Sequence, residues 1–314
     1  FFIDNLTCSI HDELLISSNF NVIKKDDPCY LFKSIKNKTE IANIKKTHIA
    51  DGVALTKFLY WLKNSPVNKS EISSENFLEK LRKSNKNYLY KSFPTISGSG
   101  PNGAIIHYKA SPSSNRKIKE NDLYLCDSGG QYKYGTTDVT RTVCFKKQSS
   151  KIKNLYTRVL KGHIAVANSR LGNFTKGSQL DKKARYWLKK IYLDFPHSTG
   201  HGVGYFLNVH EGPQAISKKN NIQLKEGMIL SNEPGYYKKG KFGIRIENLI
   251  FIKKEKNKLK FENLTLVPFE NDLIDNKYLN SEEKKYISEY HLKIYEKLKY
   301  YLSFKERKWL KQLI

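Results

Sequence analysis

Four carboxylates lie on or beside short apolar runs, in two pairs. Asp127 and Asp138 are eleven residues apart in "DLYLCDSGGQYKYGTTDVTRTVCF", and Glu233 and Glu247 are fourteen apart in "GMILSNEPGYYKKGKFGIRIENLIFI". Each segment is typical of a strand, a glycine-rich turn and a second strand, so its two arms can fold back and bring the acids together. Buried acids held close to one another repel, and they must take up protons or bind cations. The two segments therefore predict a site for two divalent metal ions.

The stretch "HSTGHGVGYFLNVHEG", residues 197–212, adds three histidines. His197 and His201 are four residues apart, and this spacing on a helix would indicate a zinc-binding pair. The glycines at 200, 202 and 204 argue against a helix, because each costs about 1 kcal/mol relative to alanine. The H-E-x-x-H motif is also absent. We therefore expect His197, His201 and His210 to have separate roles, while a buried structural role is the alternative for any one of them.

Arg245 lies two residues before Glu247, and on a strand both side chains would face the same way. It could hold the acid in its ionised form, or it could reach a substrate. The remaining histidines outside these motifs have no cluster of acids near them in the sequence, and we expect them to be structural: His11, His48, His163 and His291.

Apolar periodicity places helices before each pair of acids. The first helical segment is "TEIANIKKTHIADGVALTKFLYWLKN", which we expect to end at Pro66, and the second is "SSENFLEKLRKSN". "KIKNLYTRVLKGHIAVANSRL" and "LDKKARYWLKKIYLDF" precede the second pair of acids. Residues 281–314 are typical of one or two lysine-rich amphipathic helices anchored by Trp309. Helices followed by a hairpin with two acids thus occur twice, which indicates two related α/β halves that face each other.

The composition bears on possible partners. The formal net charge is +26, and 48 of the 56 basic residues are lysines scattered along the chain. An anionic partner such as nucleic acid or a membrane surface is one interpretation. Nucleic-acid readers favour arginine, however, so we expect a solvated lysine-rich surface and no specific nucleic-acid partner. No apolar run of 18 residues predicts a membrane span. The four cysteines form no C-x₂-C pair, which suits reduced thiols and a cytoplasmic location.

The N-terminal segment differs from the rest. Residues 1–34 are interpreted as short strands and turns, and the chain opens "FFIDNLTCSI" without an initiator methionine or the features of a signal peptide. We expect residues 1–35 to be the tail of a preceding domain whose remainder is missing, and residues 36–314 to be a separate domain. A targeting segment in that missing part would lie outside this sequence.

Five motifs carry a family resemblance: "GPNGAIIHY", "DSGGQYKYGTTDVTRT", "HSTGHGVGYFLNVHEGP", "EGMILSNEPGYY" and "FGIRIENL". In order and spacing they resemble the catalytic domain of the aminopeptidase P family, the eukaryotic three-domain Xaa-Pro aminopeptidases among the pita-bread metallopeptidases. The resemblance runs from about residue 36 to the C-terminus. It implies an α/β (α+β) pita-bread fold, in which two pseudo-symmetric halves form a curved antiparallel sheet covered by helices. It also implies a homodimer.

The resemblance further implies a ligand set for two metals. Asp127 would chelate one metal, Asp138 and Glu247 would bridge both, and His201 and Glu233 would bind the second. One imidazole with four carboxylates is a hard, oxygen-rich set that suits Mn²⁺ or Co²⁺ better than a thiolate-type zinc site. The family resemblance favours Mn²⁺, with Co²⁺ and Zn²⁺ as alternatives.

The implied reaction is release of the N-terminal residue from peptides with proline in the second position. A hydroxide that bridges the metals would attack the Xaa-Pro bond, with Glu233 as general base. His107 and His210 would orient the substrate and stabilise developing charge, and His197 would line the proline pocket. Such a bond is a tertiary amide without an N–H, so peptidases that need this donor cannot bind it.

Two alternatives stay open at this stage. A prolidase, which cuts only Xaa-Pro dipeptides, would use the same ligands, although "TTDVTRT" and "FLNVHEGP" resemble aminopeptidase P more closely. A non-enzymatic pita-bread binding protein is the second alternative. Known proteins of that kind have lost metal ligands, whereas all five are present in this sequence.

Overall fold

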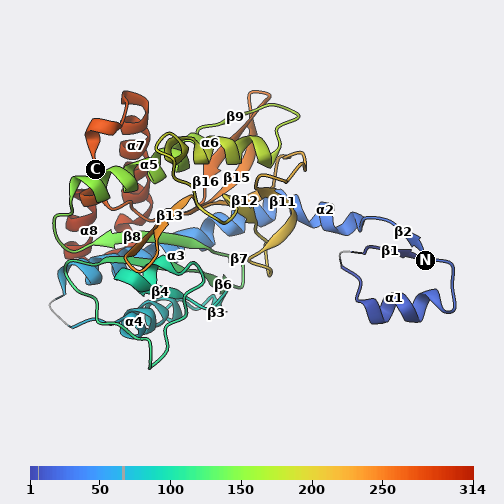
Figure 1. The fold of residues 1–314 in the computed structure, drawn as a ribbon, viewed down its shortest axis with the longest axis horizontal. Helices are drawn as coiled ribbons and strands as arrows, with labels where there is room; N and C mark the ends of the chain where they lie inside the picture. The colour runs from blue at the N-terminus through green and yellow to red at the C-terminus, as the bar shows by residue number, and fades with distance from the viewer. Residues whose placement is uncertain (6, 66–67) are drawn as a thin grey trace.

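Two helix-and-strand halves form the body of the molecule, and Figure 1 shows their helices on the outside of the strands. The computed structural model describes residues 1–5, 7–65 and 68–314. The predicted helical segments before each acid pair are all helical, and this part of the sequence interpretation is confirmed. Pro66, the expected end of the first helix, lies outside the described residues, and that helix ends at Asn64.

The first half begins with two helices, α3 (Lys38–Asn64) and α4 (Glu71–Lys83). A three-stranded antiparallel sheet follows, in the order β4 (Ile96–Ser99), β5 (Leu123–Ser128) and β8 (Val139–Cys144). β5 and β8 pair with Asp127 opposite Thr140, as the predicted hairpin requires. The connection between them is not a simple turn, because it forms the strands β6 (Gly130–Tyr132) and β7 (Gly135–Thr136). Together with β3 (Tyr88–Lys91) they make a second small sheet, in the order β3, β6, β7.

The second half repeats this plan on a larger scale. Helices α5 (Ser150–Ala167) and α6 (Gly177–Lys189) precede its main strands. The six-stranded antiparallel sheet has the order β11 (Glu211–Ile216), β10 (Gly200–Gly202), β12 (Ile229–Asn232), β15 (Asn248–Glu255), β16 (Lys258–Asn263) and β9 (Arg170–Leu171). β12 and β15 enclose a smaller hairpin, β13 (Gly235–Lys238) with β14 (Phe242–Arg245). Each half therefore carries a hairpin within a hairpin, and the acids lie where the outer arms end.

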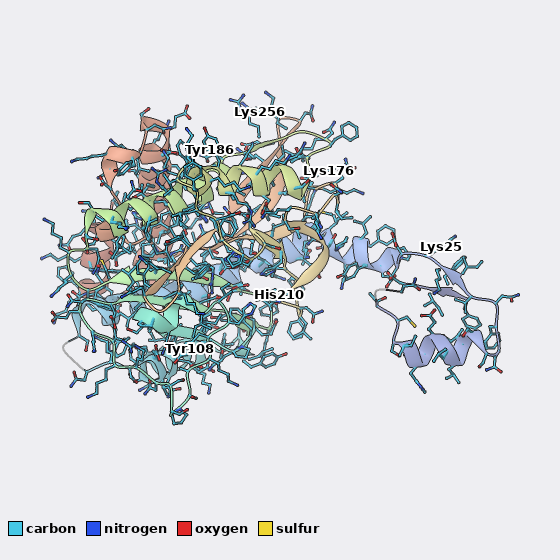
Figure 2. All side chains as sticks on the ribbon, viewed as in Figure 1. Lys25, Tyr108, Lys176, Tyr186, His210 and Lys256 are labelled. Atoms are coloured by element: carbon cyan, nitrogen blue, oxygen red, sulfur yellow. The ribbon has the colours of Figure 1, made fainter. Side chains whose placement is uncertain are left out.

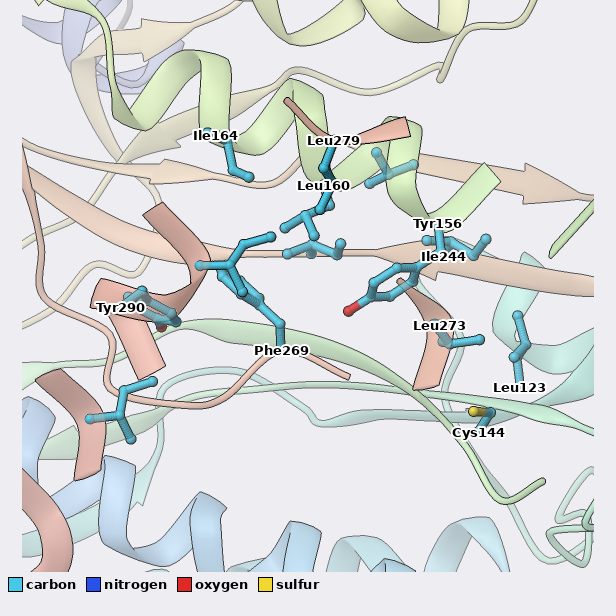
Figure 3. Packing of buried hydrophobic residues seen from close by; sticks show 14 of the residues in the cluster. Leu123, Cys144, Tyr156, Leu160, Ile164, Ile244, Phe269, Leu273, Leu279 and Tyr290 are labelled. Atoms are coloured by element: carbon cyan, nitrogen blue, oxygen red, sulfur yellow. The ribbon is translucent and has the colours of Figure 1, made fainter. Parts of the chain in front are cut away.

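A shared core holds the two halves together. Figure 3 shows apolar side chains from both halves packed against one another, with Leu123 and Cys144 from the first half and Ile244 from the second. Tyr156 of α5 and Tyr290 of α7 (Ser281–Leu298) pack in the same cluster. Such burial contributes about 1.5–3 kcal/mol for each large apolar side chain. The two halves consequently form one packed unit.

The sequence predicts one or two amphipathic helices at the C-terminus, and the structure has two, α7 and α8 (Phe304–Lys311). The ring of Trp309 lies 5.9 Å from that of Tyr60 in α3 and packs against the cores of both halves. Short 3₁₀ turns connect the remaining elements: η1 (Gly100–Ala104), η2 (Asn271–Leu273), η3 (Asn276–Tyr278) and η4 (Lys299–Tyr301).

The prediction that residues 1–34 form only strands and turns is wrong. The strands β1 (Phe2–Ile3) and β2 (Ile23–Lys24) are present, but two helices, α1 (Ile10–Ser17) and α2 (Pro28–Ser34), accompany them. The signals for these two helices are local and lie in their N-terminal capping residues. Ser9 caps α1 and Asp27 caps α2, with proline at the first helical position of α2.

In Figure 1 the segment from β1 to β2 lies apart from the body, and α2 leads from it back to β11. Leu31 and Ile35 pack against the core of the second half. The domain boundary after residue 35 therefore stays a prediction.

The surface agrees with the expectation of scattered lysines. Lys25, Lys176 and Lys256 lie on three separate segments in Figure 2. None of the described helices combines the length and apolar composition that a membrane crossing requires.

Candidate active site

One cavity of about 590 Å³ opens between the two halves, and every site residue predicted from the sequence lines it. Strand ends of the first half supply two acids, and the second half supplies the other two acids together with a histidine. Further histidines and an arginine complete the polar lining. The residues that the structure brings together are His107, Asp127, Asp138, His197, His201, His210, Glu233, Arg245 and Glu247.

Asp127 and Asp138 face each other from the two arms of the first hairpin. Asp127 is the fifth residue of β5, and Asp138 immediately precedes β8. Both are buried. One oxygen of Asp127, Oδ2, accepts a hydrogen bond of 2.5 Å from Arg245. The other, Oδ1, is buried and has no partner among residues 1–5, 7–65 and 68–314, so it can still bind a cation.

His201 lies at the middle of β10 between two glycines that have no room for a side chain, since a Cβ at Gly200 or Gly202 would clash with the backbone of a neighbouring strand. Its Nε2 is 3.4 Å from Asp138 Oδ2 and 3.4 Å from Glu233 Oε1. Its Nδ1 lies 2.9 Å from the carbonyl oxygen of Gly202 and can only donate to it, so Nε2 is the nitrogen that could bind a metal. The lone pair of Nε2 then faces two carboxylates, an arrangement that becomes favourable when a cation lies between them.

Hydroxyl groups hold the acids of the second half. Glu233 follows β12 and accepts a 2.8 Å hydrogen bond from Ser231. Glu247 lies between β14 and β15, and Thr140 of the first half donates a 2.7 Å hydrogen bond to it. The backbone N–H of Glu247 also donates to the carbonyl oxygen of Thr140. The carboxylate of Glu247 is therefore fixed across the junction of the halves.

The acids cannot all be ionised without further positive charge. Burial raises the pKa of Asp138 well above its usual range, and the charges of Asp127 and Glu233 raise it further. Burial raises the pKa of Glu247 in the same way, with Asp138 the strongest of the neighbouring charges. Burial also raises the pKa of Glu233, although His201 and Arg245 act in the opposite direction. Arg245 is the only arginine or lysine that forms an ion pair with these acids in the described part of the chain.

The donor set fits divalent metal ions. Donor atoms of Asp138, His201 and Glu247 all lie within 4.8 Å of one another. Two free lone pairs are available at this cluster. One is on the unpartnered Oδ1 of Asp127, and the other is on Nε2 of His201. Four carboxylates and one imidazole without a thiolate suit Mn²⁺, Co²⁺ or a catalytic Zn²⁺. The zinc pair of two histidines on a helix is excluded, because His197 and His201 share no helix.

Arg245 binds the protein with each of its guanidinium nitrogens. Nη2 donates to Asp127, Nη1 donates to the hydroxyl of Tyr237 at 2.7 Å, and Nε donates to the hydroxyl of Thr140 at 3.1 Å. The side chain is buried. Of the two roles expected from the sequence, this geometry favours the ion pair that holds an acid over direct contact with substrate.

His197 is linked to the same arginine through Tyr237. Its Nδ1 lies 2.7 Å from the carbonyl oxygen of Ser198, and its Nε2 lies 2.8 Å from the Tyr237 hydroxyl. Since Arg245 donates to that hydroxyl, the hydroxyl can donate to Nε2. Burial lowers the pKa of His197 to about 4, and the charge of Arg245 acts in the same direction. His197 is thus a neutral ring held in a fixed orientation.

His107 and His210 lie at the cavity mouth and are exposed. The ring of His210 stands at 88° to that of His201, with 4.2 Å between their centroids. Burial lowers the pKa of His210, and the neighbouring His201 lowers it further. The part of the cavity wall that contains His107 is mainly apolar: Phe93, Pro94, Ile96, Ile106 and Tyr108.

Several residues that shape the site were not found from the sequence. Thr140 follows Asp138 by two positions, so strand alternation could have placed it on the same face. Tyr237 has no such signal, because its partners Arg245 and His197 are brought to it only by the folded β13–β14 hairpin. The apolar wall of the cavity comes from two segments, one that leads into β4 and one that follows η1, and the sequence pattern does not define their paths.

Comparison with known proteins defines the family. A sequence profile of metallopeptidase family M24 matches residues 42–254, and one of the C-terminal region of peptidase M24 matches residues 257–314. A probable Xaa-Pro aminopeptidase P of Laccaria bicolor is 44% identical over 296 residues, which cover 89% of this chain and 46% of the relative. Its counterpart in Paracoccidioides brasiliensis is 46% identical over 297 residues, covering 89% and 48%. The chain spans about half the length of the curated relatives it matches.

Solved structures agree. A Caenorhabditis elegans X-prolyl aminopeptidase, described as a cytosolic enzyme with a di-nuclear active site, superposes with a TM-score of 0.89 at 37% identity, covering 93% of this chain and 50% of that chain. An Xaa-Pro dipeptidase of Bacillus anthracis superposes with a TM-score of 0.74 at 28% identity, covering 86% and 73%. The chain therefore belongs to metallopeptidase family M24, and its fold is the pita-bread fold.

Proposed function

We propose that this chain is the catalytic part of a metal-dependent aminopeptidase that releases the N-terminal residue from peptides with proline in the second position. The observation that carries the proposal is the convergence of three buried acids, the partly buried Glu233 and His201 in one cavity with three further histidines. The names of the fungal relatives and the similarity to the Caenorhabditis elegans enzyme support the choice of substrate.

The five donors are proposed to hold two divalent metal ions: Asp127, Asp138, His201, Glu233 and Glu247. Such ions, when bound, polarise a substrate carbonyl and lower the pKa of water. We propose Mn²⁺, because the donor set is mainly carboxylate. Co²⁺ and Zn²⁺ are the alternatives.

The chain's own groups are proposed to handle the proton and the peptide. The Glu233 carboxylate, which is 17% exposed toward the cavity, would accept the proton of the attacking water. His107 and His210, exposed at the mouth, would orient the scissile carbonyl and donate to charge that develops on it. His197, fixed by Tyr237 in its neutral form, would line the pocket for the proline ring with the neighbouring apolar wall. Arg245 would hold Asp127 ionised.

A peptide series tests the substrate class. After removal of metal with a chelator, the protein is supplied with Mn²⁺, Co²⁺ or Zn²⁺ and given Xaa-Pro-Pro-Yaa, Xaa-Pro-Yaa, Xaa-Pro and Xaa-Ala-Yaa peptides. We expect cleavage of the longer proline peptides, highest with Mn²⁺, and none of the alanine peptide. Cleavage of the dipeptide alone would identify a prolidase instead. The greater similarity to the aminopeptidase structure than to the dipeptidase structure favours the first outcome.

The proposed role of Glu233 is tested with Glu233→Gln. The amide cannot accept the proton from water, so turnover should be lost while circular dichroism and the thermal midpoint show an intact fold. Full activity in this variant would contradict the role. A protein that is folded and loaded with metal but cuts none of the peptides would support the non-enzymatic alternative.

Assembly, location and domain division complete the proposal. We propose a homodimer and a cytoplasmic enzyme, the latter supported by the cytosolic description of the Caenorhabditis elegans relative. Residues 1–35 are proposed to belong to a preceding domain, and the position of β1, α1 and β2 apart from the body in Figure 1 supports this. Light scattering tests the homodimer, and imaging of the tagged protein in cells tests the location. Limited proteolysis between residues 24 and 38 tests the domain boundary.

A further inference from the structure

A buried glutamate lies behind the loop that carries His107. Glu71 is the first residue of α4, and its exposed fraction is 0%. It forms no ion pair with a lysine, arginine or histidine among the described residues. A buried carboxylate is costly unless other groups compensate its charge. Its surroundings therefore indicate what the charge is used for.

The carboxylate of Glu71 is bound entirely by donors from one segment, residues 99–116, which we call the rim loop. Oε1 accepts from the backbone N–H of Ser99 at 2.7 Å and from the amide of Asn102 at 3.0 Å. Oε2 accepts from the hydroxyl of Tyr108 at 2.8 Å and from the backbone N–H of Arg116 at 2.9 Å. Each carboxylate oxygen therefore accepts from one backbone N–H and from at least one side chain of the rim loop.

The backbone of Glu71 ties the same elements together. Its N–H donates to the carbonyl oxygen of Arg116 at 3.0 Å, and its carbonyl oxygen accepts from the hydroxyl of Ser97 in β4 at 2.7 Å. Glu71 also lies in the first turn of α4, where the helix dipole favours negative charge. Both ends of the rim loop are thus attached to one residue.

The rim loop delivers four residues to the cavity: Ile106, His107, Tyr108 and Lys109. The His107 ring has no hydrogen-bond partner in the described part of the chain, so its position depends on its neighbours. Tyr108, the next residue, is buried, and its ring is anchored at the Glu71 carboxylate. Its backbone N–H also closes a turn onto Ile105 at 3.2 Å. Figure 2 shows Tyr108 on the lower part of the body, on a different segment from His210.

We propose that Glu71 is a positioning residue: its buried carboxylate fixes the rim loop and thereby sets the place of His107 over the substrate. This proposal rests on the aminopeptidase function proposed above. Glu71 itself touches neither the cavity nor any of the five proposed metal ligands, so it acts on the reaction only through the loop.

Glu71→Gln tests the proposal with little change in shape. The amide replaces one acceptor by an N–H₂ group, which would face the donors on that side of the carboxylate. The loop should then lose part of its anchorage. We expect kcat/KM for an Xaa-Pro-Pro-Yaa peptide to fall at least about tenfold, as for other small displacements of catalytic groups. The amount of bound metal should equal that of the wild type.

A double-mutant cycle separates positioning from general damage. If Glu71 acts through His107, then Glu71→Gln should reduce kcat/KM by less than about twofold in a His107→Ala background, because the group it positions is gone. An equal loss in both backgrounds, or no loss in either, would overturn the proposal. A wild type that cuts no proline peptide would instead remove the proposed function on which the cycle depends.

Limited proteolysis tests the loop without using activity. Lys109 is exposed in the rim loop, so release of the loop should speed trypsin cleavage after Lys109 at least about tenfold in Glu71→Gln. Glu283→Gln is the matched control, because Glu283 is also a buried glutamate in the first turn of a helix, α7, far from the rim loop in the sequence. It should leave cleavage after Lys109 unchanged. Equal cleavage of wild type and Glu71→Gln would contradict the proposal.

Discussion

The floor and the rim of the cavity are built in different ways. The floor, formed by Asp127, Asp138, His201, Glu233 and Glu247, consists of buried or partly buried groups on strands or at strand ends, where hydrogen bonds of the sheets set the backbone. The rim, formed by His107, His197 and His210, lies outside the strands, and two of its three histidines are exposed.

The difference extends to how each side chain is held. Floor groups are bound directly, and the bonds cross from one half to the other: Arg245 binds Asp127, and Thr140 binds Glu247. Rim groups have fewer such bonds: the His197 ring contacts Tyr237 and the backbone of Ser198, and the rings of His107 and His210 have no hydrogen bond within the described residues. In the proposed function the floor would bind the metal ions, and the rim would orient the substrate. Changes in the floor should abolish activity, whereas changes behind the rim should only reduce it.

The largest effect is expected from Asp138→Asn in the floor. Loss of a carboxylate that would bridge both metals should lower kcat/KM on the order of 1,000-fold and reduce the metal bound per chain. Because burial raises the pKa of Asp138, a neutral amide should not destabilise the metal-free protein. Elemental analysis and urea denaturation with and without chelator measure both effects. Marked destabilisation of the metal-free variant would show that the acid has a structural role.

Arg245→Lys tests the bond between the halves. Lysine keeps the charge but cannot reach Asp127, Tyr237 and Thr140 with separate nitrogens. We expect metal affinity to fall about 10- to 100-fold, as for other residues that orient ligands. Metal titration followed by activity gives the value. Unchanged affinity would mean that the floor is held by its strands alone.

Tyr237→Phe tests the rim. The ring remains but the hydroxyl between Arg245 and His197 is lost, so His197 gains freedom to rotate. We expect KM to rise by up to about tenfold with metal affinity within about twofold of the wild type. Tyr236→Phe is the matched control, because Tyr236 precedes it on β13 and its side chain points to the other face. Loss of metal in Tyr237→Phe would erase the distinction between floor and rim.

The smallest effect on activity is expected from His291, which lies in α7 away from both regions. Its Nε2 accepts from the N–H of Phe269, and its Nδ1 contacts the carbonyl oxygen of Leu313. Burial lowers its pKa to about 4. The unfolded chain therefore binds the proton more readily, so stability present above pH 6.5 is lost as the pH falls toward 4.

At pH 5 this loss amounts to about 2 kcal/mol relative to pH 7. In His291→Gln the stability difference between pH 7 and pH 5 should shrink by about that amount, since the carboxyl groups titrate in both proteins. Urea denaturation at the two pH values measures it, and activity at pH 7 should not change. Equal slopes in the two proteins would exclude a buried neutral His291.

The sequence predicts the acids of the floor better than the groups that bind them, for a physical reason. Strand alternation and apolar periodicity are local, so they place the helices, the two hairpins and the acids at the strand ends. The partners of those acids are not local, since Thr140 and Glu247 are 107 residues apart and only the paired halves bring them together. The sequence allows Arg245 either to hold an acid or to reach a substrate. Only the folded structure, which places Tyr237 beside it, favours the first of these roles.

Two other differences have equally specific causes. Helices α1 and α2 were missed because their apolar spacing is weak, and the capping residues Ser9 and Asp27 carry the signal instead. Glu71 carries no signal in the sequence, because an acid in the first turn of a helix is common and normally exposed. Its burial under the rim loop is a property of the tertiary structure.

The bonds that cross between the halves have a consequence for how the protein matures. Arg245 and Asp127 are 118 residues apart, so the floor cannot form in a chain whose second half is still unfolded. Metal should therefore bind only a chain in which both halves have folded, and it should stabilise that state. At a free metal concentration 100 times the dissociation constant, this linkage adds about 2.7 kcal/mol to stability. A destabilised variant could then be rescued by metal supply alone, and a metal-starved cell would lose the protein to degradation as well as its activity.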